Sequence, residues 1–199
     1  MPQISSPTPI AVLLSGGGRT LENLAEWLRD RTELARIAMV ISDRPDAGGL
    51  ARAERLEIPH RVMPCQKKRD GEAIFAALEE EGVELVVLAG FLRLLHVPER
   101  WLGRVVNIHP SLIPAHAGKG YYGNRVHAAV LEAGDRETGC TVHFVDNIYD
   151  NGKIIDRGVV AVEPGDTVET LAARVFEEEC RVYPRAIEQV LKELPTRRS

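Results

Sequence analysis

Short apolar runs alternate with segments of helical periodicity along the first half of the chain, and this alternation restricts the fold more than any other feature. The runs are almost continuously apolar and too brief for helices, which is typical of buried strands in a parallel sheet. They are Ile10–Leu14, Ile37–Ile41, Leu85–Leu88 and Val105–His109, with a shorter run at Arg61–Met63. The sequence therefore predicts an α/β fold with a doubly wound, mostly parallel sheet and helices on both faces.

Helices are predicted between these strands. Thr20 is expected as the N-cap of the first helix, because apolar residues follow it at helical spacing. Asp70 is expected to cap a later helix in the same way. Two further helical segments are predicted at Leu50–Leu56 and, more briefly, at Pro98–Trp101.

After His109 the apolar periodicity stops. The segment Pro110–Asn124 is rich in Gly, Pro, Tyr and His, so it is expected to form a long loop, and loops of about fifteen residues are usually functional. A helix over Val126–Leu131 should follow it.

The last third of the chain predicts a hairpin and a helix. Strands are expected at Thr141–Val145 and Ile154–Val162, and the turn sequence Asp150–Gly152 between them contains Asn-Gly, a strong hairpin signal. The sheet is therefore expected to end antiparallel. A final helix should begin near Thr167 and be interrupted at Pro184.

The length of 199 residues fits a single domain, with residues 1–9 and 195–199 as flexible tails. The net charge of −4 excludes a global field that would attract nucleic acid or an anionic membrane. No apolar stretch approaches a membrane span, and no targeting segment is recognisable, so a cytoplasmic location is expected.

Cys65, Cys140 and Cys180 lack metal-ligand spacing and are expected to be buried free thiols.

The turn Ser15–Gly18 lies between the first strand and the first helix, where backbone N–H groups and the helix dipole can bind an anion. It is not a Walker loop, and Leu21 stands where a dinucleotide fingerprint has its third glycine. A phosphate site and a purely structural turn both remain open, with Arg19 favouring the phosphate.

Asn107 and His109 are two apart on one strand, so their side chains share a face at the carboxyl end of the sheet. An amide can stabilise an oxyanion and an imidazole can exchange protons, a combination suited to acyl transfer. The alternative is that both side chains only form hydrogen bonds with the loop that follows. Asp150 would orient the imidazole, or else serve the hairpin turn alone. The chain lacks a nucleophile elbow and a zinc-hydrolase motif, which leaves direct attack of one substrate on another.

The segment Asn107-Ile-His-Pro-Ser-Leu-Ile-Pro114 resembles the signature of the glycinamide ribonucleotide formyltransferase family. Further similarity extends over nearly the whole chain, at Ser15–Gly18, Leu88–Arg93, Gly139–Val145, Asp150–Gly152 and Tyr183-Pro184. The resemblance implies a Rossmann-like formyltransferase fold. It also implies transfer of a formyl group from 10-formyltetrahydrofolate to the amine of 5-phosphoribosylglycinamide in de novo purine biosynthesis, through a tetrahedral intermediate.

The resemblance also assigns roles. His109 would transfer protons, Asn107 would bind the formyl oxygen and Asp150 would hold His109 in its charged form. Phosphate and ribose contacts would come from Gly17, Gly18, Arg19, Thr20 and Glu179. Folate contacts would come from Arg69, Leu92, Arg93, Leu94, Leu95, Asn107, Asp146, Asn147, Ile148, Tyr149 and Asp150. The two substrates would be the only small-molecule partners, with no metal, nucleic acid or membrane, and the chain would be a monomer or homodimer.

The sequence departs from the family pattern at two places. Arg19 and Thr20 replace the commoner Ser-Asn of the phosphate loop, so Arg19 would bind the phosphate through its positive charge instead of through a hydroxyl group. The insertion Gly118–Gly123 lengthens the long loop, and its Lys119, Tyr121 and Tyr122 are candidates for the ribonucleotide side.

Other functions are compatible with the same residues. The acceptor could be initiator methionyl-tRNA, a sugar amine or water, although relatives of those kinds usually carry an extra domain. An alternative from another class is a protein that binds a ligand with a phosphate group and catalyses no reaction.

Overall fold

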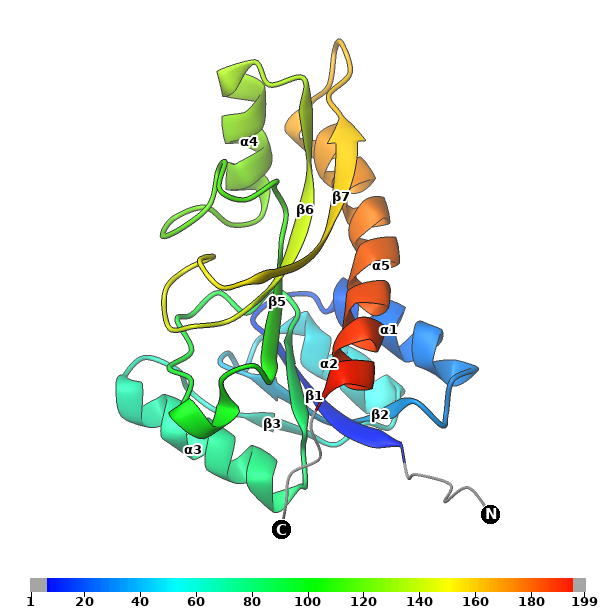
Figure 1. Cartoon of the computed structure of the whole chain (residues 1–199), viewed down its shortest axis with the longest axis vertical. Coiled ribbons are helices and arrows are strands. Elements are labelled where there is room, and N and C mark those ends of the chain that lie inside the picture. The colour runs from blue at the N-terminus through cyan, green and yellow to red at the C-terminus, as the bar shows by residue number, and fades with distance from the viewer. Residues whose placement is uncertain (1–6, 195–199) are drawn as a thin grey trace.

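The structure is a computed structural model that describes residues 7–194. These residues form a seven-stranded sheet in the order β3-β2-β1-β4-β5-β6-β7. The pairs from β3 to β5 are parallel, whereas β5–β6 and β6–β7 are antiparallel. Figure 1 shows this sheet with the C-terminal helix α5 running along its antiparallel end. The predicted α/β class, the mostly parallel sheet and the antiparallel C-terminal hairpin are confirmed.

The elements follow the expected alternation. The strands are β1 (Thr8–Leu14), β2 (Ala35–Ser42), β3 (His60–Val62), β4 (Leu85–Leu88), β5 (Val105–His109), β6 (Glu137–Phe144) and β7 (Ile154–Ala161). The helices are α1 (Arg19–Arg29), α2 (Gly48–Arg55), α3 (Lys68–Glu80), the short 3₁₀ helix η1 (Glu99–Trp101), α4 (Asn124–Ala133) and α5 (Val168–Glu193).

The predicted tails lie mostly outside the described residues, which begin at residue 7 and end at residue 194. The N-terminal boundary at residue 9 is wrong, because Thr8 and Pro9 already pair with Ala35 and Arg36 of β2. Pro9 is tolerated there near the start of the strand, where few ladder hydrogen bonds are lost.

Two predicted helix caps are corrected. Gly18, in a left-handed conformation with φ of 80°, is the N-cap of α1, and Thr20 lies inside the first turn. A Cβ atom on Gly18 would lie 2.6 Å from Cα of Gly49, so the close approach of the two loops requires glycine. Asp70 lies in the first turn of α3 and accepts hydrogen bonds from the backbone N–H groups of Gln66 and Lys67, while Lys67 is the N-cap.

The predicted interruption at Pro184 is also wrong. Helix α5 continues through this proline to Glu193. Pro184 is buried together with its neighbours Tyr183, Ala186 and Ile187, so packing against the sheet compensates for the missing backbone hydrogen bond.

The core lies on both faces of the sheet. On one face, alternate residues of β1 such as Ile10 and Val12 pack with α1, α2, α4 and α5. On the other face, Ala11 and Leu13 pack with α3 and Trp101. This two-faced burial explains why the strands are continuously apolar.

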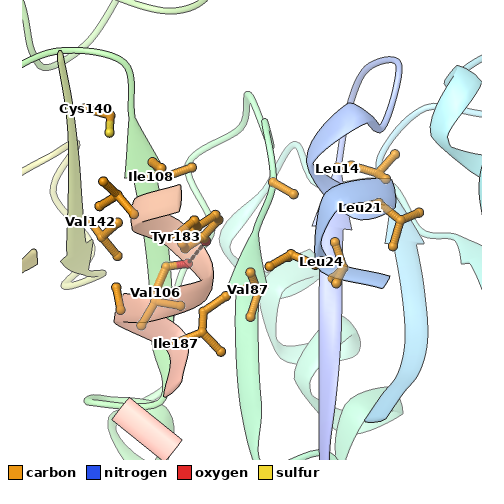
Figure 2. Close-up of a cluster of buried hydrophobic side chains, with 14 of the residues drawn as sticks. Leu14, Leu21, Leu24, Val87, Val106, Ile108, Cys140, Val142, Tyr183 and Ile187 are labelled. Carbon is orange, nitrogen blue, oxygen red and sulfur yellow. Dashed lines mark hydrogen bonds between the residues drawn. The ribbon is translucent and has the colours of Figure 1, made fainter. Parts of the chain in front are cut away.

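Tyr183 connects helix α5 to the centre of the sheet. Its side chain is fully buried, and its hydroxyl donates hydrogen bonds to the carbonyl oxygens of Leu88, at 2.8 Å, and Val106, at 3.2 Å. Figure 2 shows Tyr183 pointing from the helix at Val106. The tyrosine thereby fixes the helix against β4 and β5, the strands that lead into the predicted site.

Within residues 7–194, no helix is long and apolar enough to cross a membrane. Cys65 and Cys140 are buried free thiols as expected, whereas Cys180 is only half-buried.

Candidate functional site

A cleft of about 540 Å³ opens at the carboxyl ends of β1, β4 and β5. Its walls are the glycine turn after β1, residues 88–95 after β4, the long loop after β5, the loop between β6 and β7, and one side of α5. This is the edge at which open parallel sheets bind ligands. The cleft is lined by most of the predicted site residues: Gly17, Gly18, Arg19, Thr20, Leu92, Arg93, Leu94, Leu95, Asn107, His109, Ile148, Tyr149, Asp150 and Glu179.

His109 ends β5 and meets Asp150 from the β6–β7 loop. Nδ1 of His109 lies 3.5 Å from Oδ2 of Asp150, and both side chains are at least nine-tenths buried. Nε2 of His109 lies 2.9 Å from the carbonyl oxygen of His116 in the long loop. Each ring nitrogen therefore faces an oxygen acceptor, which suits an imidazole that takes up a proton during a reaction.

Burial and the neighbouring carboxylate act on the pKa of His109 in opposite directions. Burial lowers the pKa of His109 below its ordinary value; His143 adds to this lowering, and Asp150 and the His116 carbonyl only partly oppose it. The expectation that Asp150 holds His109 in its charged form stays a prediction: the carboxylate acts in that direction, and burial acts against it. The neutral ring can accept a proton, after which Asp150 would pair with it.

Asp150 is the anionic partner. Burial would raise the pKa of Asp150, but the imidazoles of His143 and His109 and the backbone N–H of Gly118 together bring this pKa below its ordinary value. Oδ2 of Asp150 accepts a hydrogen bond from that N–H at 2.9 Å. The backbone of Asp150 has a φ of 52°, an uncommon conformation that aims the carboxylate into the site.

Asn107 lies on the same face of β5 as His109 and pairs across the sheet with His143 of β6. Nδ2 of Asn107 lies 3.1 Å from Nε2 of His143, and Nδ1 of His143 lies 2.8 Å from the carbonyl oxygen of Phe144. The carbonyl can only accept, so Nδ1 of His143 donates to it. In the neutral ring Nε2 accepts from Asn107, and the same atom lies 3.6 Å from Oδ1 of Asp150. Asn107 is thus fixed in orientation and keeps its second N–H for a ligand oxygen.

The long loop closes over these groups. His116, which supplies the carbonyl facing His109, has a φ of 48°, and Nε2 of its own ring lies 2.6 Å from Oδ2 of Asp135. The exposed Tyr121 and Tyr122 of the insertion line the cleft beyond it, and Arg125 lies over the ring of Tyr122.

The glycine turn forms the opposite end of the cleft, at the N-terminus of α1. The exposed guanidinium of Arg19 lies 4.0 Å from the centre of the Phe176 ring on α5. Glu179, one helical turn further on, is half-buried, and burial raises its pKa to about 7 although Arg19 acts in the opposite direction. A glycine turn at a helix N-terminus, a cation and a carboxyl group with a raised pKa therefore lie together in the cleft.

Three predicted folate residues do not line the cleft. Arg69 is 80% exposed and lies near Asp70. Asp146 accepts hydrogen bonds from Ile148 and Asn151 inside its own loop. Asn147 donates to the carbonyl oxygen of Val97 and accepts from the N–H of the same residue, so it anchors the β6–β7 loop to the backbone at Val97.

Sequence reasoning assigned no role to three residues of the site. His143 orients Asn107, and the ring of Phe176 packs against the guanidinium of Arg19. His127 of α4 lines the cleft, and its buried Nδ1 has no hydrogen-bond partner. The pairing of β5 with β6 could have suggested His143, because it places this residue opposite Asn107.

In the part of the chain that the structure describes, no cluster of three or more His, Cys, Asp or Glu side chains could hold a metal ion.

Comparison with known proteins gives consistent results. The model of the family described as formyl transferase matches residues 8–187. The phosphoribosylglycinamide formyltransferase of Haemophilus influenzae is 38% identical over 184 residues, which cover 89% of this chain and 84% of that protein. The solved structure of glycinamide ribonucleotide transformylase 1 from Symbiobacterium toebii superposes with a TM-score of 0.86 at 39% identity, covering 94% of this chain and 89% of that one.

Some relatives are much longer. The trifunctional purine biosynthetic protein adenosine-3 of Gallus gallus is 44% identical over 187 residues, which are 91% of this chain. The chain spans only 18% of the length of that protein.

Proposed function

Because this chain belongs to the formyl transferase family, which implies a formyl donor, we propose that it transfers the formyl group of 10-formyltetrahydrofolate to the amine of 5-phosphoribosylglycinamide. This reaction is a step of purine biosynthesis. The observation that carries the proposal is the meeting of Asn107, His109 and Asp150 in one cleft with the glycine turn at its other end.

The reaction proceeds by direct attack. The neutral amine adds to the formyl carbon, the C–N bond forms, and the electron pair of the carbonyl moves to its oxygen. The remaining N–H of Asn107 donates to this oxyanion, and a preorganised donor of this kind commonly contributes a hundredfold or more to the rate.

Proton transfer completes the step. His109, neutral at rest, takes the proton that the attacking nitrogen loses, and Asp150 stabilises the resulting imidazolium. The intermediate then collapses, the bond from the formyl carbon to the folate nitrogen breaks, and that nitrogen receives the proton from His109. Atoms and charges balance without a further reactant.

The glycine turn and α5 serve the acceptor. The phosphate binds at Gly17, Gly18 and the N-terminus of α1, where backbone N–H groups and the helix dipole favour an anion. Arg19 replaces the hydroxyl of the commoner family pattern with a cation held over Phe176. Glu179 accepts hydrogen bonds from the ribose.

The opposite wall serves the folate. The exposed apolar side chains of Leu92, Ile148 and Tyr149 line this part of the cleft, and residues 92–95 and 148–150 offer backbone groups to a flat heterocycle. Arg69, Asp146 and Asn147 take no direct part in this proposal because they lie outside the cleft.

The test is turnover of the purified protein with both substrates, followed as formylation of 5-phosphoribosylglycinamide by mass spectrometry. Formylated product at a rate that depends on both substrates supports the proposal. Formate released without the acceptor would indicate a hydrolase instead. Binding of either substrate without any turnover would indicate a protein that has lost catalysis.

A further inference from the structure

Asp43 follows β2 at the carboxyl edge of the sheet and has no part in the chemistry described above. Its side chain is only 3% exposed, which is unusual for a carboxylate and requires hydrogen-bonding partners. Oδ1 of Asp43 accepts a hydrogen bond from the hydroxyl of Ser15 at 2.5 Å, and Oδ2 accepts one from Nε of Arg93 at 3.3 Å. The carboxylate thus connects the ends of three strands that are distant in the sequence.

Ser15 extends this connection to the backbone of the folate wall. Its buried hydroxyl accepts a hydrogen bond from the N–H of Leu92 at 2.9 Å while it donates to Asp43. The N–H of Ser15 donates to the carbonyl oxygen of Gly90 at 3.0 Å. Leu92 and Arg93, neighbours in the chain, are therefore both held by one carboxylate, the first through Ser15 and the second directly.

The segment 91–95 belongs to neither a helix nor a strand; its ends, Phe91 and Leu95, are buried in the core. Between them Leu92 and Arg93 are exposed to the cleft, so the Asp43 contacts complete the fixation of the segment at its middle. The glycine turn begins at Ser15, but beyond Ser15 it is anchored without Asp43: the N–H of Gly49 donates to the carbonyl oxygen of Gly16 at 3.0 Å, and Gly18 packs directly on Gly49. Loss of the Asp43 carboxylate should therefore disturb the folate wall more than the phosphate loop.

We propose that Asp43 is a positioning residue for the formyl donor: through Ser15 and Arg93 it fixes residues 91–95 in the conformation that receives the folate. This inference rests on the proposed function, since it assumes that the wall formed by these residues binds the folate. Asp43 is not among the residues that line the cleft, so it would act on the reaction only through the two residues that it holds.

The experiment compares Asp43→Ala, Asp43→Asn and the wild-type protein by calorimetric titration with tetrahydrofolate and, separately, with 5-phosphoribosylglycinamide. Asp43→Ala should weaken tetrahydrofolate binding about tenfold, since it removes charge-assisted hydrogen bonds, and change acceptor binding less than twofold. Asp43→Asn should lie between the two, because its oxygen can still accept from Ser15 but carries no charge to face Arg93. In steady-state kinetics the same pattern should appear as a raised KM for the donor alone.

Asp46→Asn is the matched control. Asp46 lies three residues further along the same loop, is 67% exposed and pairs with Arg44 at 2.8 Å. This variant should bind both compounds as the wild type does. If Asp43→Ala does not fold, Ser15→Ala provides the same comparison, because it removes the link between Asp43 and Leu92 and leaves the carboxylate paired with Arg93.

The outcomes separate the two proposals. Wild-type protein that binds no tetrahydrofolate contradicts the proposed function itself. Wild-type binding with unchanged affinity in Asp43→Ala overturns the positioning role alone. An equal loss of affinity for both compounds also overturns it, since that result would reflect general destabilisation of the cleft.

Discussion

Nδ1 of His109 lies 3.5 Å from the carboxylate of Asp150, a residue in the loop that connects β6 and β7. The two groups influence each other in opposite senses. The carboxylate raises the pKa of His109, yet burial of the ring outweighs it, so the resting imidazole has a lowered pKa. The pair is therefore arranged to stabilise a charge that appears during the reaction.

Replacing Asp150 by Asn should move the acid limb of the rate–pH profile to lower pH. Turnover requires neutral His109, so activity falls as the pH drops through the pKa of His109. The carboxylate raises that pKa, so its removal lowers it. The profile of kcat/KM against pH measures the shift. Asp146→Asn, a change in the same loop, should leave the limb in place, and an unmoved limb in Asp150→Asn would contradict the coupling.

His109→Ala should lose turnover and retain substrate binding. Proton transfer by a positioned side chain contributes about a hundredfold to ten-thousandfold, so kcat should fall by that order. Tetrahydrofolate affinity, measured by calorimetry, should change little. His60→Ala changes an exposed histidine of β3 and provides the control for general effects. Full activity in His109→Ala would remove this residue from the mechanism.

Arg19→Gln should raise the KM for 5-phosphoribosylglycinamide about tenfold. The guanidinium lies over Phe176 beside the glycine turn, and the proposed charge-assisted hydrogen bond to the substrate phosphate would be lost with it. The KM of the wild type should also rise with salt concentration more steeply than that of the variant. Arg29→Gln, at the other end of α1, should behave as the wild type. A donor KM that rises equally would argue against a role on the acceptor side.

Glu179→Gln should change how stability depends on pH. The pKa of Glu179 is about 7 in the folded protein, against 4.5 for an ordinary Glu. A raised folded pKa gives stability that is present below pH 4.5 and is lost as the pH rises to about 7. Relative to Glu179→Gln, the wild type should therefore lose about 1–3 kcal/mol of unfolding free energy across that range. Urea unfolding at several pH values tests this, with the exposed Glu177→Gln as control; a constant difference would contradict it.

Tyr183→Phe should destabilise the protein by about 1–3 kcal/mol, because it leaves buried carbonyl oxygens of β4 and β5 without their tyrosine donor. Thermal or urea unfolding measures the loss. Tyr121→Phe alters an exposed tyrosine and should have no such effect. Equal stability of the two variants would show that the hydroxyl contacts contribute nothing.

The sequence predicts the strands well because both faces of the sheet are covered. Leu85–Leu88 and Val105–His109 coincide with β4 and β5, since continuous burial leaves a continuous apolar run. The predicted helix interruption at Pro184 and the predicted N-cap at Thr20 were wrong for a different reason. Packing of α5 against the sheet and the contact of Gly18 with Gly49 are tertiary effects, which local patterns do not contain.

The candidate site was predictable where chemistry follows from spacing along one strand, as at Asn107 and His109. It was not predictable where partners meet across the fold. His143 orients Asn107 only because β6 pairs with β5 in one register, and the contact of His109 with His116 uses a backbone carbonyl, which leaves no trace in residue types. The lowered pKa of His109 likewise depends on burial.

Helix α5 is the last element of the described chain, yet it supplies Phe176 and Glu179 to the cleft and the Tyr183 bridge to β4 and β5. All seven strands precede it. A nascent chain can therefore contain every strand, with Asn107, His109 and Asp150 already made, and still lack one wall of its site. The wall formed by α5 is thus the last part of the described cleft to be synthesised.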